Sequence, residues 1–165
     1  MEYFIFCDGS CHNKPGENST GYAAVLTDRL FATFDNVLNK YIGTRAEGTS
    51  NLAEWDALIL GMQLMIEHNG ANTDGYNSYH IFTDSDLIAN QANGNWRVRE
   101  PTFWPFYKRF KDLRRQANAC RISYSIKWIS RKQNKIADFY SREANPHYPD
   151  KQLDKNISDV RRVKR

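Results

Sequence analysis

Four acidic residues occupy places where elements of an α/β protein begin or end: Asp8, Glu54, Asp84 and Asp138. Asp8 directly follows the apolar run 3–7, and Asp84 directly follows the short run 79–83. Glu54 and Asp138 lie early in two predicted helices. Carboxylate oxygens are the ligands that hard divalent cations prefer, so these residues could assemble a metal site if the fold brings them together.

Each carboxylate also has a simpler explanation when it is considered alone. Asp8-Gly9 could open a hairpin turn, and Glu54 could interact favourably with its helix dipole or act as a cap. Two buried strands that each end in an aspartate are harder to explain in this way. The carboxyl edge of strands in an open α/β sheet is where ligands bind, which favours a site.

The charged residues are distributed unevenly along the chain. Residues 1–96 contain 4 lysines and arginines against 12 acidic residues, whereas residues 97–135 contain 12 against 2. Residues 151–165 are basic again, with 6 against 2. Carboxylates in one half and cations in the other suit a metal-dependent enzyme that acts on a polyanion, although any single Lys or Arg could simply be solvated.

Length and composition indicate one globular domain. The chain has 165 residues, of which 41% are apolar and 25% are charged, enough for a substantial core. No apolar run is long enough for a membrane span, and no signal peptide is evident. Three irregularly spaced cysteines argue against a disulfide framework. We therefore expect a cytoplasmic protein with no membrane association.

Apolar runs and alternation predict five strands, at residues 3–7, 20–27, 30–37, 79–83 and 121–128. The first three are expected to form an antiparallel meander, with loops at 9–19 and 40–49. In the last strand, Ile122, Tyr124, Ile126 and Trp128 alternate and predict one buried face.

Helical periodicity predicts four helices, the first with its periodic stretch at 52–66 and closed by Asn69-Gly70, and the others at residues 86–92, 103–119 and 134–144. Possible N-cap residues stand at 49–51 before the first helix and at Ser85 before the second. The order β-β-β-α-β-α-α-β-α predicts a mixed sheet flanked by helices. We expect a domain at 1–145 and a basic, extended C-terminal tail at 146–165.

Several segments together resemble the type 1 ribonuclease H family. They are DGSC at 8–11, NKPG at 13–16, GYAAVL at 21–26, TSNLAE at 49–54, TDS at 83–85 and WISRKQNKIAD at 128–138. The resemblance spans residues 3–145 and keeps the order of the family. It implies an α/β, ribonuclease H-like fold, whose five-stranded mixed sheet has three antiparallel and two parallel strands.

The resemblance also implies an activity, the hydrolysis of the RNA strand of RNA/DNA hybrids that leaves 5′-phosphate and 3′-hydroxyl ends. By resemblance, two Mg²⁺ ions, for which Mn²⁺ could substitute, are held by four catalytic carboxylates. Asp8 would bridge both ions, Glu54 and Asp84 would hold one, and Asp138 would hold the other. Such a pair lies about 4 Å apart in two-metal sites.

Substrate contacts follow from the same resemblance. Gly9, Ser10, Ser50 and Asn51 match positions that contact 2′-hydroxyls, while Asn51 could equally be a helix N-cap. Arg97, Arg99 and the basic face at 108–115 would contact phosphates. The expected partner is an RNA/DNA hybrid duplex, with duplex RNA as a second ligand, and the protein is expected to be a monomer.

Two departures from the family pattern stand out. Only residues 96–101 occupy the place of a basic protrusion that some members carry, so this chain resembles the compact members. The loop before Asp138 lacks the His that many members have, and Arg131 is the nearest candidate for a related role. The alternatives are a nucleic-acid-binding module that does not hydrolyse, and a related DNA nuclease such as a junction resolvase.

Overall fold

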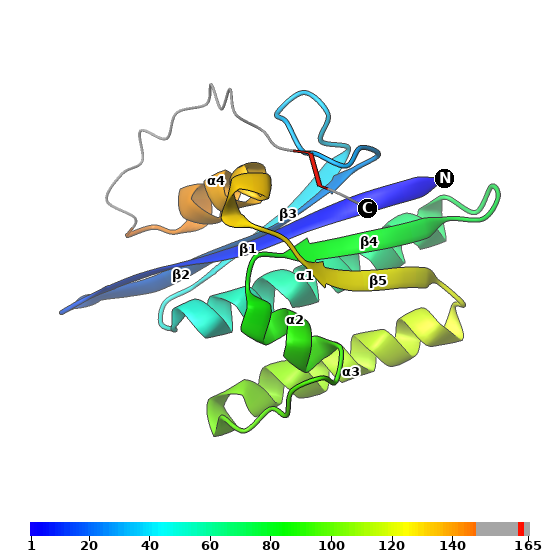
Figure 1. The fold of residues 1–165 in the computed structure, drawn as a ribbon. Coiled ribbons are helices and arrows are strands. Elements are labelled where there is room, and N and C mark those ends of the chain that lie inside the picture. Colours follow the sequence, from blue (N-terminus) through cyan, green and yellow to red (C-terminus); the bar gives the residue numbers. More distant parts are fainter. Residues whose placement is uncertain (148–161, 164–165) are drawn as a thin grey trace.

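The structure, a computed structural model, describes residues 1–147 and 162–163 and contains a five-stranded mixed sheet (Figure 1). The strand order is β3-β2-β1-β4-β5. β1, β2 and β3 pair antiparallel, and β4 and β5 continue the sheet parallel to β1. The strands are β1 (Glu2–Lys14), β2 (Glu17–Thr27), β3 (Asn39–Arg45), β4 (Ser78–Thr83) and β5 (Ser123–Trp128). The predicted fold class is confirmed.

Within residues 1–147, four α-helices cover the two faces of this sheet. They are α1 (Ser50–Ala71), α2 (Asp86–Ala92), α3 (Trp104–Ala119) and α4 (Lys135–Ala144), with short 3-10 turns at Pro101–Phe103 and Arg131–Gln133. α1 packs on β1 and β2 with α3 beyond it, whereas α4 lies on the opposite face over the same two strands (Figure 1). All four helices begin or end within a few residues of their predicted positions.

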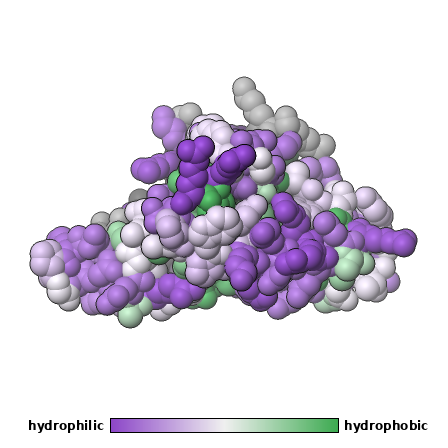
Figure 2. Space-filling view, turned by 90° about the horizontal axis from the view of Figure 1, so that it is seen from below, coloured by the Kyte–Doolittle hydropathy of each residue, from purple (hydrophilic) through white to green (hydrophobic). Residues whose placement is uncertain are grey.

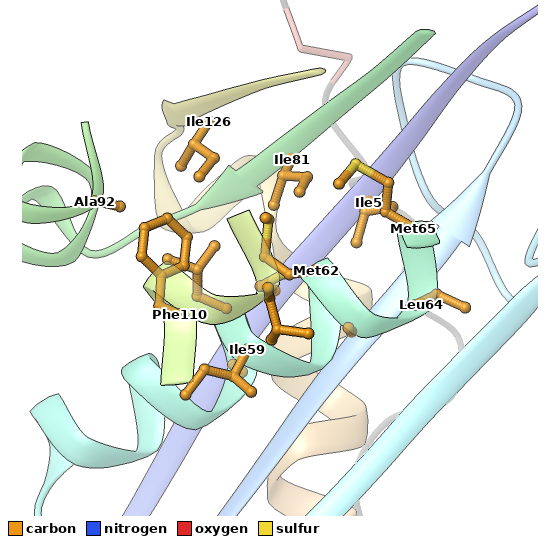
Figure 3. Close-up of a cluster of buried hydrophobic side chains, with 14 of the residues drawn as sticks. Ile5, Ile59, Met62, Leu64, Met65, Ile81, Ala92, Phe110 and Ile126 are labelled. Atoms are coloured by element: carbon orange, nitrogen blue, oxygen red, sulfur yellow. The ribbon is translucent and has the colours of Figure 1, made fainter. Parts of the chain in front are cut away.

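The first half of β1 is buried on both faces, as its apolar run predicted. Ile5 and Cys7 point into the main core, where Figure 3 shows Ile5 near residues of α1 and β4. Phe4 and Phe6 point into a second core cluster beneath α4. Alternate side chains of a strand face opposite sides of a sheet, so one short run supplies two cores.

Asp8 does not end its strand, which corrects the prediction of a strand tip followed by a loop at 9–19. β1 continues to Lys14 and pairs with β2 as far as Lys14 and Glu17. The turn falls at Pro15-Gly16, where Gly16 has a φ of 78°. What ends near Asp8 is the neighbouring strand, because the pairing of β1 with β4 stops at Cys7 and Thr83. Asp8 therefore still lies at the carboxyl end of β4, where β1 has no partner strand on that side.

The third strand was predicted at the wrong place. Residues 30–37 form a loop whose apolar side chains enter the second core cluster, among them Leu30 and Ala32. The strand is β3, which starts at Asn39 and otherwise falls within the predicted loop 40–49. It is an edge strand with mostly exposed side chains, held by backbone pairing to β2, so its residues show no buried face in the sequence.

Two smaller predictions are also settled by the described residues. Trp128 is 54% exposed, so the predicted buried face of β5 ends before it. The N-cap of α1 is Thr49, whose hydroxyl accepts from the Leu52 N–H, and Asn51 is not the cap. Of the predicted tail, residues 148–161 and 164–165 lie outside the described residues.

The surface on the side of α3 is largely hydrophilic. Viewed from below the orientation of Figure 1, hydrophilic residues cover most of the face, with small hydrophobic areas between them (Figure 2). Among the described helices, none is both long enough and apolar enough to cross a membrane.

Candidate active site

Three carboxylates from distant parts of the chain converge at the edge of the sheet. They are Asp8 in β1, Glu54 in α1 and Asp84 directly after β4. Each offers one oxygen, and these oxygens all lie within 4.8 Å of one another. Asp8 is 4% exposed, and the other two side chains are half-buried. The structure thus brings together three of the four predicted carboxylates as one cluster.

The close approach of β1 to α1 places Asp8 beside Glu54. A Cβ added to Gly9 would lie 2.3 Å from the carbonyl carbon of Ala53, so only a glycine fits there. The Gly that follows Asp8 therefore serves a packing contact between strand and helix.

Asp84 is held by groups from the other end of the chain. Asn134 Nδ2 donates to the Cys7 backbone oxygen at 2.8 Å and to Asp84 Oδ2 at 3.2 Å. The Trp128 indole N–H donates to the Asp84 backbone oxygen at 3.1 Å. These contacts tie β1, the end of β4 and the residues before α4 into one unit.

Asp138 lines the same pocket but stands apart from the cluster of three. Its Oδ2 pairs with Arg142 Nη2 at 3.0 Å, one helical turn later. α4 is fixed to the sheet because Ser10 Oγ donates to the Ser141 backbone oxygen at 3.0 Å. Asp138 thus faces the pocket from the opposite layer, with its charge partly balanced by its own helix.

Burial and mutual repulsion make the clustered carboxylates hard to ionise together. Burial raises the pKa of Asp8 well above its ordinary value, and the charges of Glu54 and Asp84 raise it further. Burial, followed by the charge of Asp84, raises the pKa of Glu54 to about 8. Burial also raises the pKa of Asp84, which the Asn134 hydrogen bond and then the Arg131 charge lower in part. A cation between these groups would relieve the repulsion.

The donor atoms of this cluster fit a hard divalent cation. All are carboxylate oxygens, which Mg²⁺ and Mn²⁺ favour. Glu54 Oε2 is buried and has no hydrogen-bond partner among the described residues. A buried acceptor with no donor is costly unless a ligand completes it. Asp8, Glu54 and Asp84 are therefore the residues that could hold a metal.

The predicted substrate-binding residues divide between two neighbouring hollows. Gly9, Ser10, Ser50 and Arg131 line the carboxylate pocket, whose volume is about 400 Å³. Asn51 instead lines an adjoining groove of about 750 Å³. Thr49, Arg97 and Arg99 also line that groove, so the N-terminal end of α1 lies between the two.

Two residues near the carboxylates were not among the predicted site residues. Arg142 stands four residues after Asp138 in a helix, a spacing that indicates a salt bridge. Asn134 precedes α4 and carries no comparable signal, because its two partners, Cys7 and Asp84, are far away in sequence.

Residues 6–144 match the family model described as reverse transcriptase-like. The bifunctional protein Rv2228c of Mycobacterium tuberculosis is 28% identical over 144 residues, which cover 87% of this chain but 35% of that protein. A ribonuclease HI of Halobacterium salinarum is 26% identical, covering 84% of this chain and 62% of that protein. The chain thus spans about a third of the first of these relatives.

Solved structures agree with the fold. The N-terminal RNase H domain of Rv2228c from Mycobacterium tuberculosis superposes with a TM-score of 0.67 at 26% identity, covering 87% of this chain and 92% of that one. LC11-RNase H1, solved with an RNA/DNA hybrid, has a TM-score of 0.68 at 24% identity, covering 86% and 95%. With the match over residues 6–144, these findings show that the chain belongs to the reverse transcriptase-like family and has the fold of type 1 ribonucleases H.

Proposed function

We propose that the chain is an endoribonuclease that hydrolyses the RNA strand of RNA/DNA hybrids. The observation that carries this proposal is the convergence of Asp8, Glu54 and Asp84 within 4.8 Å, with Asp138 on the same pocket. The family match and the relatives named as ribonucleases H support it. A binding module has no need of three half-buried or buried carboxylates whose charges repel one another.

The proposed reaction depends on two divalent ions, which Asp8, Glu54, Asp84 and Asp138 would hold. Asp8 would be the shared ligand, Glu54 and Asp84 would serve one ion, and Asp138, now paired with Arg142, would serve the other. The bound ions supply activation of the attacking water and neutralisation of the leaving 3′ oxygen. The products are then a 5′-phosphate and a 3′-hydroxyl. Mg²⁺ is the proposed ion, and Mn²⁺ is a substitute with the same oxygen ligands.

The two adjoining hollows suggest how the duplex lies on the protein. The RNA strand enters the carboxylate pocket, where Gly9, Ser10 and Ser50 lie within reach of 2′-hydroxyls and Arg131 lies within reach of a phosphate. The other strand follows the adjoining groove, where Arg97 and Arg99 contact phosphates, and Asn51, next to Ser50, contacts a 2′-hydroxyl of the RNA strand. Contacts to 2′-hydroxyls across the minor groove distinguish hybrids from duplex DNA. Duplex RNA is expected to be a weaker ligand than the hybrid.

We also propose that the enzyme acts as a monomer in the cytoplasm. All three cysteines, Cys7, Cys11 and Cys120, are free, which suits a reducing compartment. Gel filtration of the purified protein with light scattering tests the monomer.

Cleavage of labelled substrates tests the main proposal. The parent should cut the RNA strand of a hybrid with Mg²⁺ or Mn²⁺, and leave single-stranded RNA, duplex DNA and a four-way DNA junction intact. Duplex RNA, assayed beside them, should be cut more slowly than the hybrid. Asp8→Asn and Asp84→Asn should each lower the rate by at least about a hundredfold, because each removes a charge that the transition state needs.

The matched control is Asp74→Asn, the same chemical change at an exposed position in the loop after α1. It should cut as fast as the parent. Asp8→Asn protein that retains the parental rate would contradict the site. Preferred cleavage of the junction would support a resolvase, and hybrid binding without cleavage by the parent would support a binding module.

A further inference from the structure

The side chain of Val163 is built into the second core cluster. It is 5% exposed and packs among residues from both ends of the chain. Its backbone N–H donates to the Leu30 backbone oxygen at 2.8 Å. The cluster contains Phe4 and Phe6 of β1, Phe82 of β4, Leu30, Ile129 and Ile136. Residues 162–163 are therefore anchored between the loop after β2 and the start of α4.

A single side chain connects this C-terminal anchor, residues 162–163, to the turn before α4. Gln133 Nε2 donates to the Arg162 backbone oxygen at 3.2 Å. The other end of the same amide, Oε1, accepts from the backbone N–H and the hydroxyl of Ser130, both at 3.1 Å. Gln133 thus closes its own turn and attaches that turn to the anchor.

The turn so attached carries two residues of the candidate site. Residues 129–134 begin with Ile129, which extends the β4–β5 pairing through its N–H to the Thr83 oxygen at 2.9 Å. Arg131 lines the carboxylate pocket, and Asn134 bridges Cys7 and Asp84. The segment therefore has the site on one side and the anchor on the other.

We propose that residues 162–163 brace the segment 129–134 and so position Arg131 and Asn134 for the reaction, a role that rests on the proposed function. Val163 and Gln133 are positioning residues, because they act through the segment and not on the substrate. Docking of the anchor buries an apolar side chain against Ile129 and Ile136, and loss of that contact frees the segment from one side.

Hydrogen exchange of the metal-free protein tests the brace without reference to activity. Val163→Asp places a charge in an apolar cluster and should speed exchange in residues 129–134 by about tenfold or more. Gln133→Glu keeps the acceptor for Ser130, replaces the donor to Arg162 with an acceptor and adds a negative charge. Because the lost hydrogen bond is exposed, this variant should speed exchange in residues 129–134 by about threefold.

Two controls separate the brace from a general loss of stability. Val163→Ile keeps an apolar side chain and should exchange as the parent does. Gln116→Glu makes the same change as Gln133→Glu on the exposed side of α3 and should leave residues 129–134 unaffected. In all variants, peptides from α3 should keep parental exchange rates.

Kinetics on an RNA/DNA hybrid give the functional readout. Val163→Asp and Gln133→Glu should lower kcat, by about tenfold and about threefold, with KM within about twofold, because misplacement of site residues affects the transition state more than binding. Val163→Ile should keep the kcat of the parent. Unchanged exchange in residues 129–134, or equal acceleration in α3, would overturn the brace. A parent that does not cut the hybrid would refute the proposed function and leave the exchange result to decide the brace.

Discussion

Asn134 donates from Nδ2 to Oδ2 of Asp84 across 3.2 Å, although 50 residues separate the two in sequence. The same nitrogen donates to the Cys7 backbone oxygen, directly before Asp8. Asn134 is 1% exposed. A buried amide thus sets the spacing between the strands that carry two of the clustered carboxylates.

Asn134→Ala should weaken both the fold and the metal site. Loss of the donor leaves the buried Cys7 oxygen unpaired, which should cost about 2 kcal/mol of unfolding free energy. Asp84 also loses its orientation, so Mg²⁺ affinity should fall by about tenfold, as expected for the loss of a residue that orients a ligand. Urea unfolding and isothermal titration with Mg²⁺ measure the two effects. Parental Mg²⁺ affinity in this variant would show that Asn134 does not orient Asp84.

The raised pKa of Glu54 predicts how the metal-free protein responds to pH. Between its ordinary value of 4.5 and about 8, Glu54 stays protonated when folded but releases its proton when unfolded. Stability should therefore fall as pH rises through this window. Asp8, with its pKa also raised, acts in the same direction. With EDTA present, Tm should drop by about 5 °C from about pH 5 to about pH 8.

Glu54→Gln removes one of the titrating groups and should flatten this pH profile. Mg²⁺ should reverse the loss in the parent, because binding to the ionised carboxylates stabilises the folded state by mass action. Thermal unfolding across pH, with EDTA and with Mg²⁺, provides the comparison. A Glu54→Gln profile as steep as that of the parent would mean that other groups cause the dependence.

Gly9→Ala should separate β1 from α1. The added Cβ would lie 2.3 Å from backbone atoms of Ala53, which cannot move without shifting the helix. We expect a destabilisation of about 3 kcal/mol together with weaker Mg²⁺ binding, since overpacking forces the backbone apart. Gly70→Ala, near the end of α1, is the control, because a Cβ there meets open space. Equal unfolding midpoints of the two variants in urea would disprove the contact.

Arg45 and Asp56 form a half-buried ion pair away from the site. Arg45 Nε and Nη2 donate to the two carboxylate oxygens at 2.6 and 3.0 Å, and the Asp56 side chain is 7% exposed. Arg45→Ala should cost about 2 kcal/mol, less than a fully buried pair would because half of the Arg45 side chain faces solvent. Arg29→Ala removes an exposed partner of Asp28 and should cost under about 0.5 kcal/mol. Urea unfolding that ranks these two variants in the reverse order would contradict the prediction.

Local pattern was sufficient where side-chain burial follows the sequence. The run before Asp8 predicted a strand buried on both faces, and the periodicity of residues 52–66 predicted α1. It failed for β3, because an edge strand is held by backbone hydrogen bonds to β2 that leave no trace in side-chain polarity. The apolar residues of 30–37 have the pattern of a strand, but they lie in a loop and pack into the second core cluster.

Residue types and their order along the chain indicate which side chains could form the site: four carboxylates within segments that resemble one family, and a basic block to meet a polyanion. How these side chains are grouped depends on the folded structure. Asp8 and Glu54 converge because Gly9 has no side chain to keep α1 away from β1. Asp84 is held beside them by its hydrogen bond from Asn134. Asp138, in the opposite layer, pairs with Arg142. Such groupings depend on packing distances between elements far apart in the chain, and no local pattern of residues contains those distances.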